Sequence, residues 1–330
     1  MNDQNANQQS KARAVNRRTF LQTAAVAAAG SAILPAQGLK GAPYIKRFAD
    51  VKIGAISYSY RALPSSAEEI LGYLVQGGLS TVELMGGPAE AYAGIPEGPE
   101  RPAREASEAE RAEFQQARDA HSKEVLSWRL SAGTAKFAEL GRMYADAGVA
   151  VDILKLGAPG WSDAEIDYAY NAARAMGARG ISFEGGDESA ERMGPFATRH
   201  ALYNGMHNHT QVADPGWSLD RILSHSPYNA LNLDIGHYVA GTGDSPVPVI
   251  RKYHDRITHL HIKDRRSPAN GGDNVSWGEG DTPIAEVLRL IQTEGYPITA
   301  MIELEYPVPE TSNVLMEVAK CVGFCRGALN

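Results

Sequence analysis

Five segments in the second half of the sequence place carboxylates, imidazoles and a lysine two or three residues apart. In chain order they are Ser182-Phe183-Glu184, His207-Asn208-His209, Asp234-Ile235-Gly236-His237, His259-Leu260-His261-Ile262-Lys263 and Glu303-Leu304-Glu305. Carboxylate oxygens and neutral imidazole nitrogens are good ligands for divalent cations. Collecting many such groups in apolar surroundings is costly unless they are paired or bind a cation. These residue types therefore predict a divalent metal site.

Each of these segments ends or contains a short β-rich stretch. From residue 51 onward such stretches alternate with amphipathic helical ones. The predicted strands are Val51–Ser57, Thr81–Leu84, Val151–Leu156, Gly180–Glu184, Tyr203–Asn208, Ala230–Asp234, Ile257–Ile262 and Thr299–Leu304. The predicted helices are Ala67–Gln76, Ser107–Leu126, Ala135–Ala147, Asp163–Met176, Glu188–His200, Leu219–Ser224, Val247–Tyr253, Ile284–Thr293 and Asn313–Phe324. Eight strand–helix units without an internal linker predict an α/β fold with a single closed (β/α)₈ TIM barrel, rather than an open doubly wound sheet.

The strand ends are expected to bring the polar groups together. Alternate side chains of a strand point to the same side, so the last inward side chains of several barrel strands converge above the barrel core. Active sites of such barrels lie at this end. Two segments that follow strands, Gly86–Arg104 and Arg265–Asp281, are predicted to be inserted loops that shape or cover the site.

Four motifs near these strand ends carry a specific resemblance. They are Asp-x-Gly-His at 234–237, His-x-Lys-Asp at 261–264, Gly-Glu-Gly-Asp at 278–281 and the glutamate that ends the last strand. They resemble the xylose-isomerase-like family, which includes sugar phosphate isomerases and epimerases, inosose dehydratases and apurinic endonucleases. The resemblance covers essentially the whole chain after the leader and is strongest over residues 200–306. It implies one TIM barrel domain, residues 43–330, holding one divalent ion (Mn²⁺, Co²⁺, Zn²⁺ or Mg²⁺).

The resemblance also implies which residues hold the metal. By it, Asp234, His261 and Glu303 are three ligands. Family members commonly place a glutamate at the end of strand five as the fourth ligand, whereas this sequence has His207 and His209 there. Glu184, one strand earlier, is the other candidate, so the fourth ligand is left open between these three residues. We expect Glu303 and either Glu184 or His207 to act as the catalytic acid and base.

Further residues near the strand ends are candidates for binding the sugar. The expected substrate contacts are His209, His237, Lys263, Trp277 and Lys155. Trp277 would stack on a sugar face, and His237 has a second interpretation as a group that orients Asp234. For Lys155 and Glu83 a salt bridge within the barrel mouth is the favoured alternative. We favour a structural role for His259 and a rim position for Glu305.

The chemistry expected of such a site is proton transfer next to a carbonyl group. A sugar that chelates the metal through a carbonyl and a neighbouring hydroxyl has an acidified α C–H, because the metal stabilises the developing enediolate. The resemblance thus implies a metal-dependent isomerase or epimerase acting on a keto-sugar or sugar derivative. A β-eliminating lyase or dehydratase acting on a 3-keto-glycoside or inosose through the same intermediate stays open. So does a non-catalytic sugar-binding barrel.

Composition and charge argue against a nucleic-acid partner. A chain of 330 residues, 43% of them hydrophobic, can bury a full core. Its formal net charge of −7 argues against a nucleic-acid partner. Against an apurinic endonuclease there is also Arg265-Arg266 after Asp264, where a second histidine would be needed. We expect a small-molecule carbohydrate as partner, with homo-oligomerisation left open.

The N-terminal segment predicts export. Asn16-Arg17-Arg18-Thr19-Phe20-Leu21 precedes an alanine-rich apolar run, Thr23–Leu34, and Pro35-Ala36. This pattern resembles a twin-arginine signal peptide, and its apolar run is too short to span a bilayer. Residues 1–42 are therefore predicted to be a signal peptide and linker, and the mature protein to be periplasmic. Export favours a non-phosphorylated sugar, because phosphorylated intermediates are mainly cytoplasmic.

Overall fold

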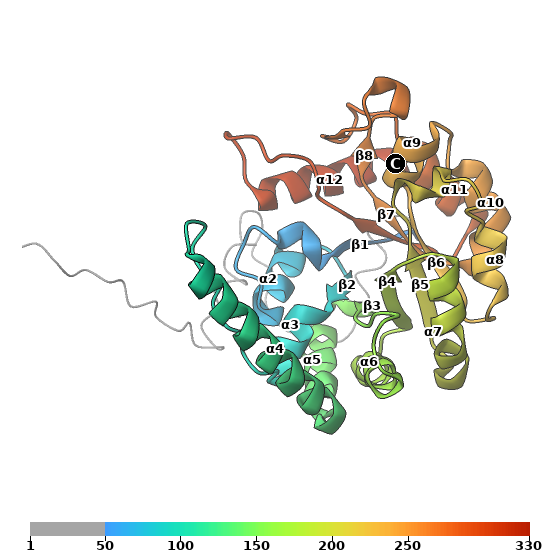
Figure 1. Ribbon diagram of the computed structural model, residues 1–330. Coiled ribbons are helices and arrows are strands. Elements are labelled where there is room, and N and C mark those ends of the chain that lie inside the picture. The colour runs from blue at the N-terminus through green and yellow to red at the C-terminus, as the bar shows by residue number, and fades with distance from the viewer. Residues whose placement is uncertain (1–49) are drawn as a thin grey trace, which may run out of the picture. The chain divides into compact units, whose positions relative to one another are not determined.

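The computed structural model of the chain describes residues 50–330, so the predicted signal peptide lies outside the described residues. Eight parallel strands close into one barrel (Figure 1), in the order β1-β10-β7-β6-β5-β4-β3-β2. Their bounds are β1 Lys52–Ile56, β2 Thr81–Met85, β3 Ala150–Lys155, β4 Gly180–Glu184, β5 Tyr203–His207, β6 Asn229–Asp234, β7 Ile257–Ile262 and β10 Thr299–Ile302. The prediction of a single closed (β/α)₈ barrel is confirmed, and all eight predicted strands are present.

Helices follow the strands and cover the outside of the barrel (Figure 1). Their bounds are α2 Ala67–Gly77, α3 Gly86–Ala93, α4 Glu108–Ser131, α5 Ala135–Asp146, α6 Asp163–Met176, α7 Asp187–His200, α8 Leu219–Ser224, α9 Ile235–Thr242, α10 Val247–Tyr253, α11 Ile284–Glu294 and α12 Val314–Leu329. No helix within residues 50–330 is both long enough and apolar enough to cross a membrane.

Three of these helices begin with the same local device. Ser66, Ser107 and Ser162 each accept a hydrogen bond from the backbone N–H three residues on, and the glutamate at that position bonds back to the serine N–H. This capping box satisfies backbone donors that a helix start leaves unpaired. It fixes where α2, α4 and α6 begin, and the sequence prediction placed these starts within one residue.

Two helices on the catalytic face were not predicted. The segment beginning at Gly86, expected to be a loop, starts with α3 even though Gly-Gly-Pro is a weak helix former. Its Glu90 is buried and bonds Arg129 near the end of α4, so tertiary contacts hold this helix in place. The other helix, α9, begins directly after β6, where the side chain of Asp234 accepts a hydrogen bond from the N–H of His237.

The segment after β7 is a small hairpin rather than an irregular loop. Strands β8 (Asp264–Arg265) and β9 (Asn274–Val275) pair antiparallel. The buried carboxylate of Asp264 accepts hydrogen bonds from the N–H groups of Gly278, Gly280 and Thr282, at 2.7, 3.0 and 3.2 Å. A Cβ at Gly280 would lie 2.2 Å from Asp264 Oδ1, so only glycine fits there. The Gly-Glu-Gly-Asp motif thus folds around one carboxylate.

A separate polar cluster ties strands together across the barrel. Asp152 on β3 is buried and bonds Arg179, which precedes β4, through two contacts of 2.6 and 2.7 Å. Asp152 also accepts a hydrogen bond from Thr299 at the start of β10 at 3.0 Å. Arg179 donates to the carbonyl of Thr258 on β7 at 3.0 Å. Because these residues lie at or near strand starts, the cluster belongs to the end of the barrel opposite the predicted site.

Candidate metal centre

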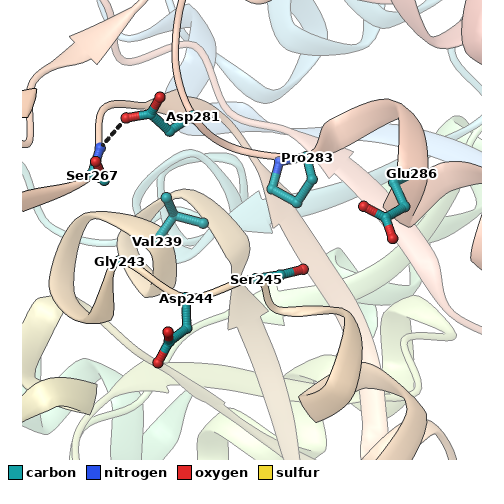
Figure 2. A pocket seen from close by; sticks show the side chains of 8 residues that line it. All are labelled: Val239, Gly243, Asp244, Ser245, Ser267, Asp281, Pro283 and Glu286. Atoms are coloured by element: carbon teal, nitrogen blue, oxygen red, sulfur yellow. Dashed lines mark hydrogen bonds between the residues drawn. The ribbon is translucent and has the colours of Figure 1, made fainter.

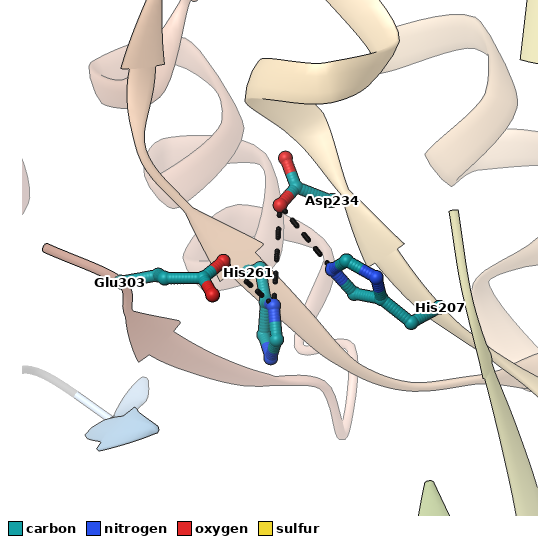
Figure 3. A group of neighbouring side chains, drawn as sticks. All are labelled: His207, Asp234, His261 and Glu303. Atoms are coloured by element: carbon teal, nitrogen blue, oxygen red, sulfur yellow. Dashed lines mark ion pairs between the residues drawn. The ribbon is translucent and has the colours of Figure 1, made fainter. Parts of the chain in front are cut away.

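Four side chains from successive strand ends meet in the mouth of the barrel (Figure 3). His207 ends β5, Asp234 ends β6, His261 lies near the end of β7, and Glu303 follows β10. All four are at most 5% exposed. One ligand atom from each lies within 4.8 Å of the others. The nearest pairs are His261 Nδ1 with Glu303 Oε2 at 2.9 Å, and His207 Nε2 with Asp234 Oδ2 at 3.4 Å.

The converging atoms make ion pairs with one another and with Lys263. His207 Nε2, Asp234 Oδ2, His261 Nδ1 and Glu303 Oε2 are all buried and lack a hydrogen bond of good geometry. Carboxylates and imidazoles packed this closely in a buried site require balancing positive charge. Two imidazole nitrogens and two carboxylate oxygens are a donor set suited to a divalent transition metal. The residues present therefore fit the metal that the sequence predicted.

Both histidines are held from behind by a carboxylate. His207 Nδ1 donates to Glu184 Oε2 at 2.7 Å, and His261 Nε2 donates to Glu83 Oε2. A carboxylate on the far nitrogen fixes the tautomer and ring orientation of a ligating imidazole and makes it a stronger ligand. In both rings this leaves the other nitrogen aimed at the cluster. The arrangement is the one that metal-binding histidines use.

Glu83 on β2 sits in a polar layer directly below the cluster. It is fully buried, accepts a hydrogen bond from Ser182, and lies 3.2 Å from Nε2 of His259. Asn232 on β6 approaches both Glu83 and His261, at 3.4 and 3.1 Å. Burial opposes the ionised form of Glu83, but the neighbouring His261 and His259 hold its pKa well below the usual range. Glu83 therefore remains a carboxylate inside the barrel.

The charges of the cluster shift its titration strongly. Burial acts against a charge on His261, but the carboxylates of Glu303 and Glu83 outweigh it and raise the pKa of His261 to about 10. Burial acts in the same way on Glu303, yet His261 and Lys263 lower the pKa of Glu303 to about 2. In the protein without metal, a protonated imidazole thus partly fills the place of a cation. Metal binding would displace that proton.

Lys263 adds a buried ammonium to the same site. Its Nζ lies 2.8 Å from Asp234 Oδ2, 2.8 Å from Glu303 Oε2 and 2.5 Å from Glu305 Oε2. Burial disfavours its charge, but these three carboxylates raise the pKa of Lys263 above its ordinary value. A Cβ at Gly236 would lie 2.4 Å from Lys263 Cγ, so the glycine of the Asp-x-Gly-His motif leaves room for this side chain.

His237 packs beside Lys263 on the first turn of α9. Its Nε2 lies 3.1 Å from Lys263 Nζ, and its Nδ1 is in hydrogen-bond contact with the guanidinium of Arg265. Burial and the positive charge of Lys263 outweigh the opposing effect of Asp234 and lower the pKa of His237 to about 3. His237 is therefore a neutral imidazole at the edge of the cluster.

At the rim of the site, Glu184 pairs with His209 and with Lys155. Glu184 accepts hydrogen bonds from His209 Nε2 at 2.8 Å and from Lys155 Nζ at 2.7 Å, besides the one from His207. The Glu184 and His209 side chains are about half exposed, at 49% and 51%. The hydrogen bond to Glu184 is the main reason why the pKa of His209 is raised.

The structure brings most of the predicted site residues together. His207, Asp234, His261, Glu303 and Lys263 meet in the buried cluster, and Glu184, His209, His237 and Lys155 surround it. Of the candidates for the fourth ligand, His207 is the one whose free nitrogen faces the cluster. Trp277 packs with its ring edge-on to Phe324 of α12, at 5.7 Å between centroids.

Sequence reasoning missed several residues that shape the site. Asn232 and Ser182 received no role, although their place two residues before Asp234 and Glu184 marks them as inward-facing. Asp264 and Arg265 were seen only as part of a motif and a loop. The pairing of Glu83 with His261 had no local signal, because the two residues are 178 positions apart.

A second concave region lies away from the cluster. A pocket of about 360 Å³ opens between α9, α11 and the hairpin (Figure 2). It is lined by Val239, Gly243, Asp244, Ser245, Ser267, Asp281, Pro283 and Glu286. None of the candidate metal ligands lines it. Its Asp281 accepts a hydrogen bond from the N–H of Ser267, which ties the hairpin connection to the segment after β9.

Comparisons with known proteins agree with this geometry. The model of the family described as "Xylose isomerase-like TIM barrel" matches residues 78–320. No curated protein sequence matches the chain. Among solved structures, a sugar phosphate isomerase/epimerase from Parabacteroides distasonis is similar, with 15% identity, a TM-score of 0.56, and coverage of 88% of this chain and 97% of that one.

Two further solved structures share the fold. The 3-keto-D-glucoside 4-epimerase YcjR from E. coli has 12% identity and a TM-score of 0.53, with coverage of 84% of this chain and 99% of that one. The probable 3-DHS dehydratase AsbF from Bacillus anthracis has 15% identity and a TM-score of 0.54, with coverage of 83% and 99%. At these identities the likeness concerns the fold alone.

Proposed function

The chain belongs to the xylose isomerase-like TIM barrel family, and from that premise we propose that it is a divalent-metal-dependent isomerase or epimerase of a keto-sugar or sugar derivative. One observation carries the proposal. Four buried ligand atoms, two imidazole nitrogens and two carboxylate oxygens, converge within 4.8 Å of one another at the catalytic end of the barrel. A donor set of this kind suits a divalent metal.

His207, Asp234, His261 and Glu303 would hold the metal. When bound, a divalent cation supplies Lewis-acid stabilisation of negative charge that develops on a substrate oxygen. Glu83 and Glu184 keep the two imidazoles in the orientation that binding needs. Burial of the cluster keeps water from competing with the substrate.

The residues around the cluster supply proton transfer. Glu303 would take the proton from the carbon next to the substrate carbonyl through Oε1, because its Oε2 faces the metal cluster. The opposite flank is formed by Glu184 and His209, joined at 2.8 Å. We propose that this flank returns a proton to the neighbouring carbon or to the opposite face. Lys263 and His237 would position the substrate oxygens.

A β-eliminating lyase or dehydratase is a second candidate, and the asymmetry of the site favours it. One flank is a buried carboxylate, Glu303, whereas the other is a half-exposed imidazole–carboxylate pair, His209 with Glu184. A base on one side and a different, hydrogen-bonded donor on the other suits proton removal followed by protonation of a leaving group. The two reactions share the first proton removal.

The metal proposal is tested by elemental analysis of purified protein. We expect about one divalent ion per chain in the wild type and its loss in Asp234→Asn, His261→Gln and Glu303→Gln. Asp244→Asn and Glu310→Gln, which change exposed carboxylates outside the cluster, should retain the ion. A wild type that takes up no Mn²⁺, Co²⁺ or Zn²⁺ would refute the proposal and leave a sugar-binding barrel.

The reaction is tested by incubating the metal-loaded enzyme with keto-sugars and 3-keto-glycosides in D₂O. Deuterium uptake at a sugar carbon with a changed configuration or carbonyl position would support an isomerase or epimerase. An unsaturated product would identify a lyase. Absence of deuterium exchange in every sugar would contradict both reactions. Glu303→Gln, which lacks the proposed base, is the control for exchange that the site does not catalyse.

We further propose that the protein acts in the periplasm. The support is the Arg17-Arg18 pattern and its apolar run in the sequence. Replacing both arginines by lysine should retain the protein in the cytoplasm, whereas Lys11→Arg should not affect export. Cell fractionation measures this, and unchanged export of the double variant would contradict the proposal.

A further inference from the structure

His237 lies between two permanent hydrogen-bond donors. Its Nδ1 contacts Nη1 of Arg265, and its Nε2 lies 3.1 Å from Nζ of Lys263. A neutral imidazole carries one N–H and one lone pair, so it can accept a hydrogen bond from only one of the two. The structure therefore contains a conflict that the tautomer of His237 must resolve.

The two donors differ in whether they can redirect their hydrogens. The hydrogens of a guanidinium are fixed in its plane, whereas an ammonium turns its three hydrogens about the Cε–Nζ bond. Lys263 has three carboxylates nearer than His237, at 2.5 to 2.8 Å. Its hydrogens can turn to these carboxylates, which are the stronger acceptors. The Arg265 guanidinium has no such freedom.

Arg265 is also fixed at its other edge. Its Nε donates to the carbonyl of Gly272 at 3.0 Å, and its Nη2 donates to the same oxygen. That carbonyl belongs to the connection of the β8–β9 hairpin. The guanidinium is thus pinned between the hairpin and α9, with the Nη1 hydrogen directed at His237.

We propose that Arg265 is a positioning residue that fixes His237 in the tautomer with its hydrogen on Nε2. In this tautomer the N–H has no protein acceptor within hydrogen-bond distance among its charged neighbours. Asp234 Oδ2 lies 3.8 Å away and Glu305 Oε2 lies 3.9 Å away. His237 Nε2 lies beside the cluster, 3.1 Å from Lys263 Nζ and 3.8 Å from Asp234 Oδ2, and its hydrogen would bond a carbonyl or hydroxyl oxygen of the substrate. This last step rests on the proposed function.

The tautomer can be read directly from NMR spectra. Protein labelled with ¹⁵N-histidine and loaded with diamagnetic Mg²⁺ or Zn²⁺ gives long-range ¹H–¹⁵N patterns that distinguish the two neutral tautomers. The chain has nine histidines, and the signal missing in His237→Gln identifies His237. We expect the Nε2–H form in the wild type and in Arg266→Met, a matched change at the exposed neighbour.

Variants of Arg265 decide the cause. Arg265→Met should convert His237 to the Nδ1–H form or to a mixture, because Lys263 is then the remaining donor. Arg265→Lys keeps a cation and should restore part of the Nε2–H form. A wild type with the hydrogen on Nδ1, or an unchanged tautomer in Arg265→Met, would overturn the proposal.

Kinetics separate this role from direct substrate binding. With a sugar that the wild type converts, Arg265→Met should lower kcat about 10- to 100-fold and change KM less than about threefold. A raised KM with unchanged kcat would mean that Arg265 binds substrate itself, and would overturn the positioning role. The NMR result needs no substrate, so it stands or fails independently of whether any sugar is converted.

Discussion

Each of the two imidazoles that face the cluster, His261 and His207, donates a hydrogen bond to a carboxylate from its far nitrogen. The two carboxylates differ in their exposure to solvent. Glu83 is fully buried behind His261, whereas Glu184 is half exposed behind His207. A buried carboxylate is screened less by water and salt, so it acts more strongly on its histidine. Glu83 should therefore contribute more to metal affinity than Glu184.

Glu83→Gln keeps the shape of the side chain and removes its charge. We expect metal affinity to fall about 10- to 100-fold, because His261 becomes a weaker ligand when the acceptor behind it is no longer charged. Glu184→Gln should have a smaller effect in the same direction. Competition with a chelator measures the affinity, and Glu97→Gln on an exposed loop is the control. Equal affinity in Glu83→Gln and wild type would show that this carboxylate does not tune the site.

The sequence predicted the residues of the cluster better than their contacts. Asp234, His261 and Glu303 end neighbouring strands inside recognisable motifs, so their meeting followed from the barrel itself. Which nitrogen of His207 faces the cluster depends on the position of Glu184 on the neighbouring strand β4. The sequence does not give the register between β4 and β5. For the same reason, Glu83 had two open interpretations until its contact with His261 was visible.

At the scale of elements, the hairpin after β7 depends on one carboxylate. Asp264 accepts three backbone hydrogen bonds and is 2% exposed. Asp264→Ala should lower the free energy of unfolding by about 2–4 kcal/mol, since three N–H groups lose their acceptor. Hydrogen exchange should rise across residues 264–282 while the barrel strands stay protected. The exposed Asp273→Ala is the control, and unchanged protection of the hairpin in Asp264→Ala would contradict this account.

The eight barrel strands and nine of the helices in residues 50–330 were predicted, whereas α3 and α9 were not. The barrel strands are short apolar runs bounded by turn residues, and this signal is local. Helix α3 has almost no such signal, because it starts with Gly-Gly-Pro and depends on the distant Arg129. Helix α9 begins within the metal-binding motif, where Asp234 both ends a strand and caps a helix. In both cases tertiary contacts decide what the local sequence leaves undetermined.

At the scale of the whole molecule, the buried Asp152, which joins strands across the barrel, makes the stability of the fold depend on pH. Burial opposes its ionisation, but Arg179 outweighs this and lowers the pKa of Asp152. A carboxyl with a lowered pKa in the folded state stabilises the fold fully above its unfolded pKa of about 3.9. That contribution is lost as the pH falls through the folded value.

Asp152→Asn should therefore lower the free energy of unfolding more at neutral pH than in acid. We expect its free energy of unfolding at pH 7 to be about 1–3 kcal/mol lower than that of the wild type, because Arg179 and Thr299 lose a charged partner. The difference should narrow as the pH falls below about 4. Urea unfolding at pH 7 and 3.5 measures this, with the exposed Asp146→Asn as control. A gap that is constant with pH would contradict the assignment.

The contact between Glu83 and His261 also has a consequence for biosynthesis. The two residues are 178 positions apart, so at about 5–20 residues per second the ribosome needs roughly 10–35 s to supply the partner of Glu83. Until then the nascent chain holds a carboxylate whose burial is unfavourable unless it is paired or protonated. Burial of strand β2 is therefore opposed while β3 to β6 emerge, although Lys155 on β3 supplies some positive charge. The core of this barrel is completed late, when β7 and β10 leave the ribosome.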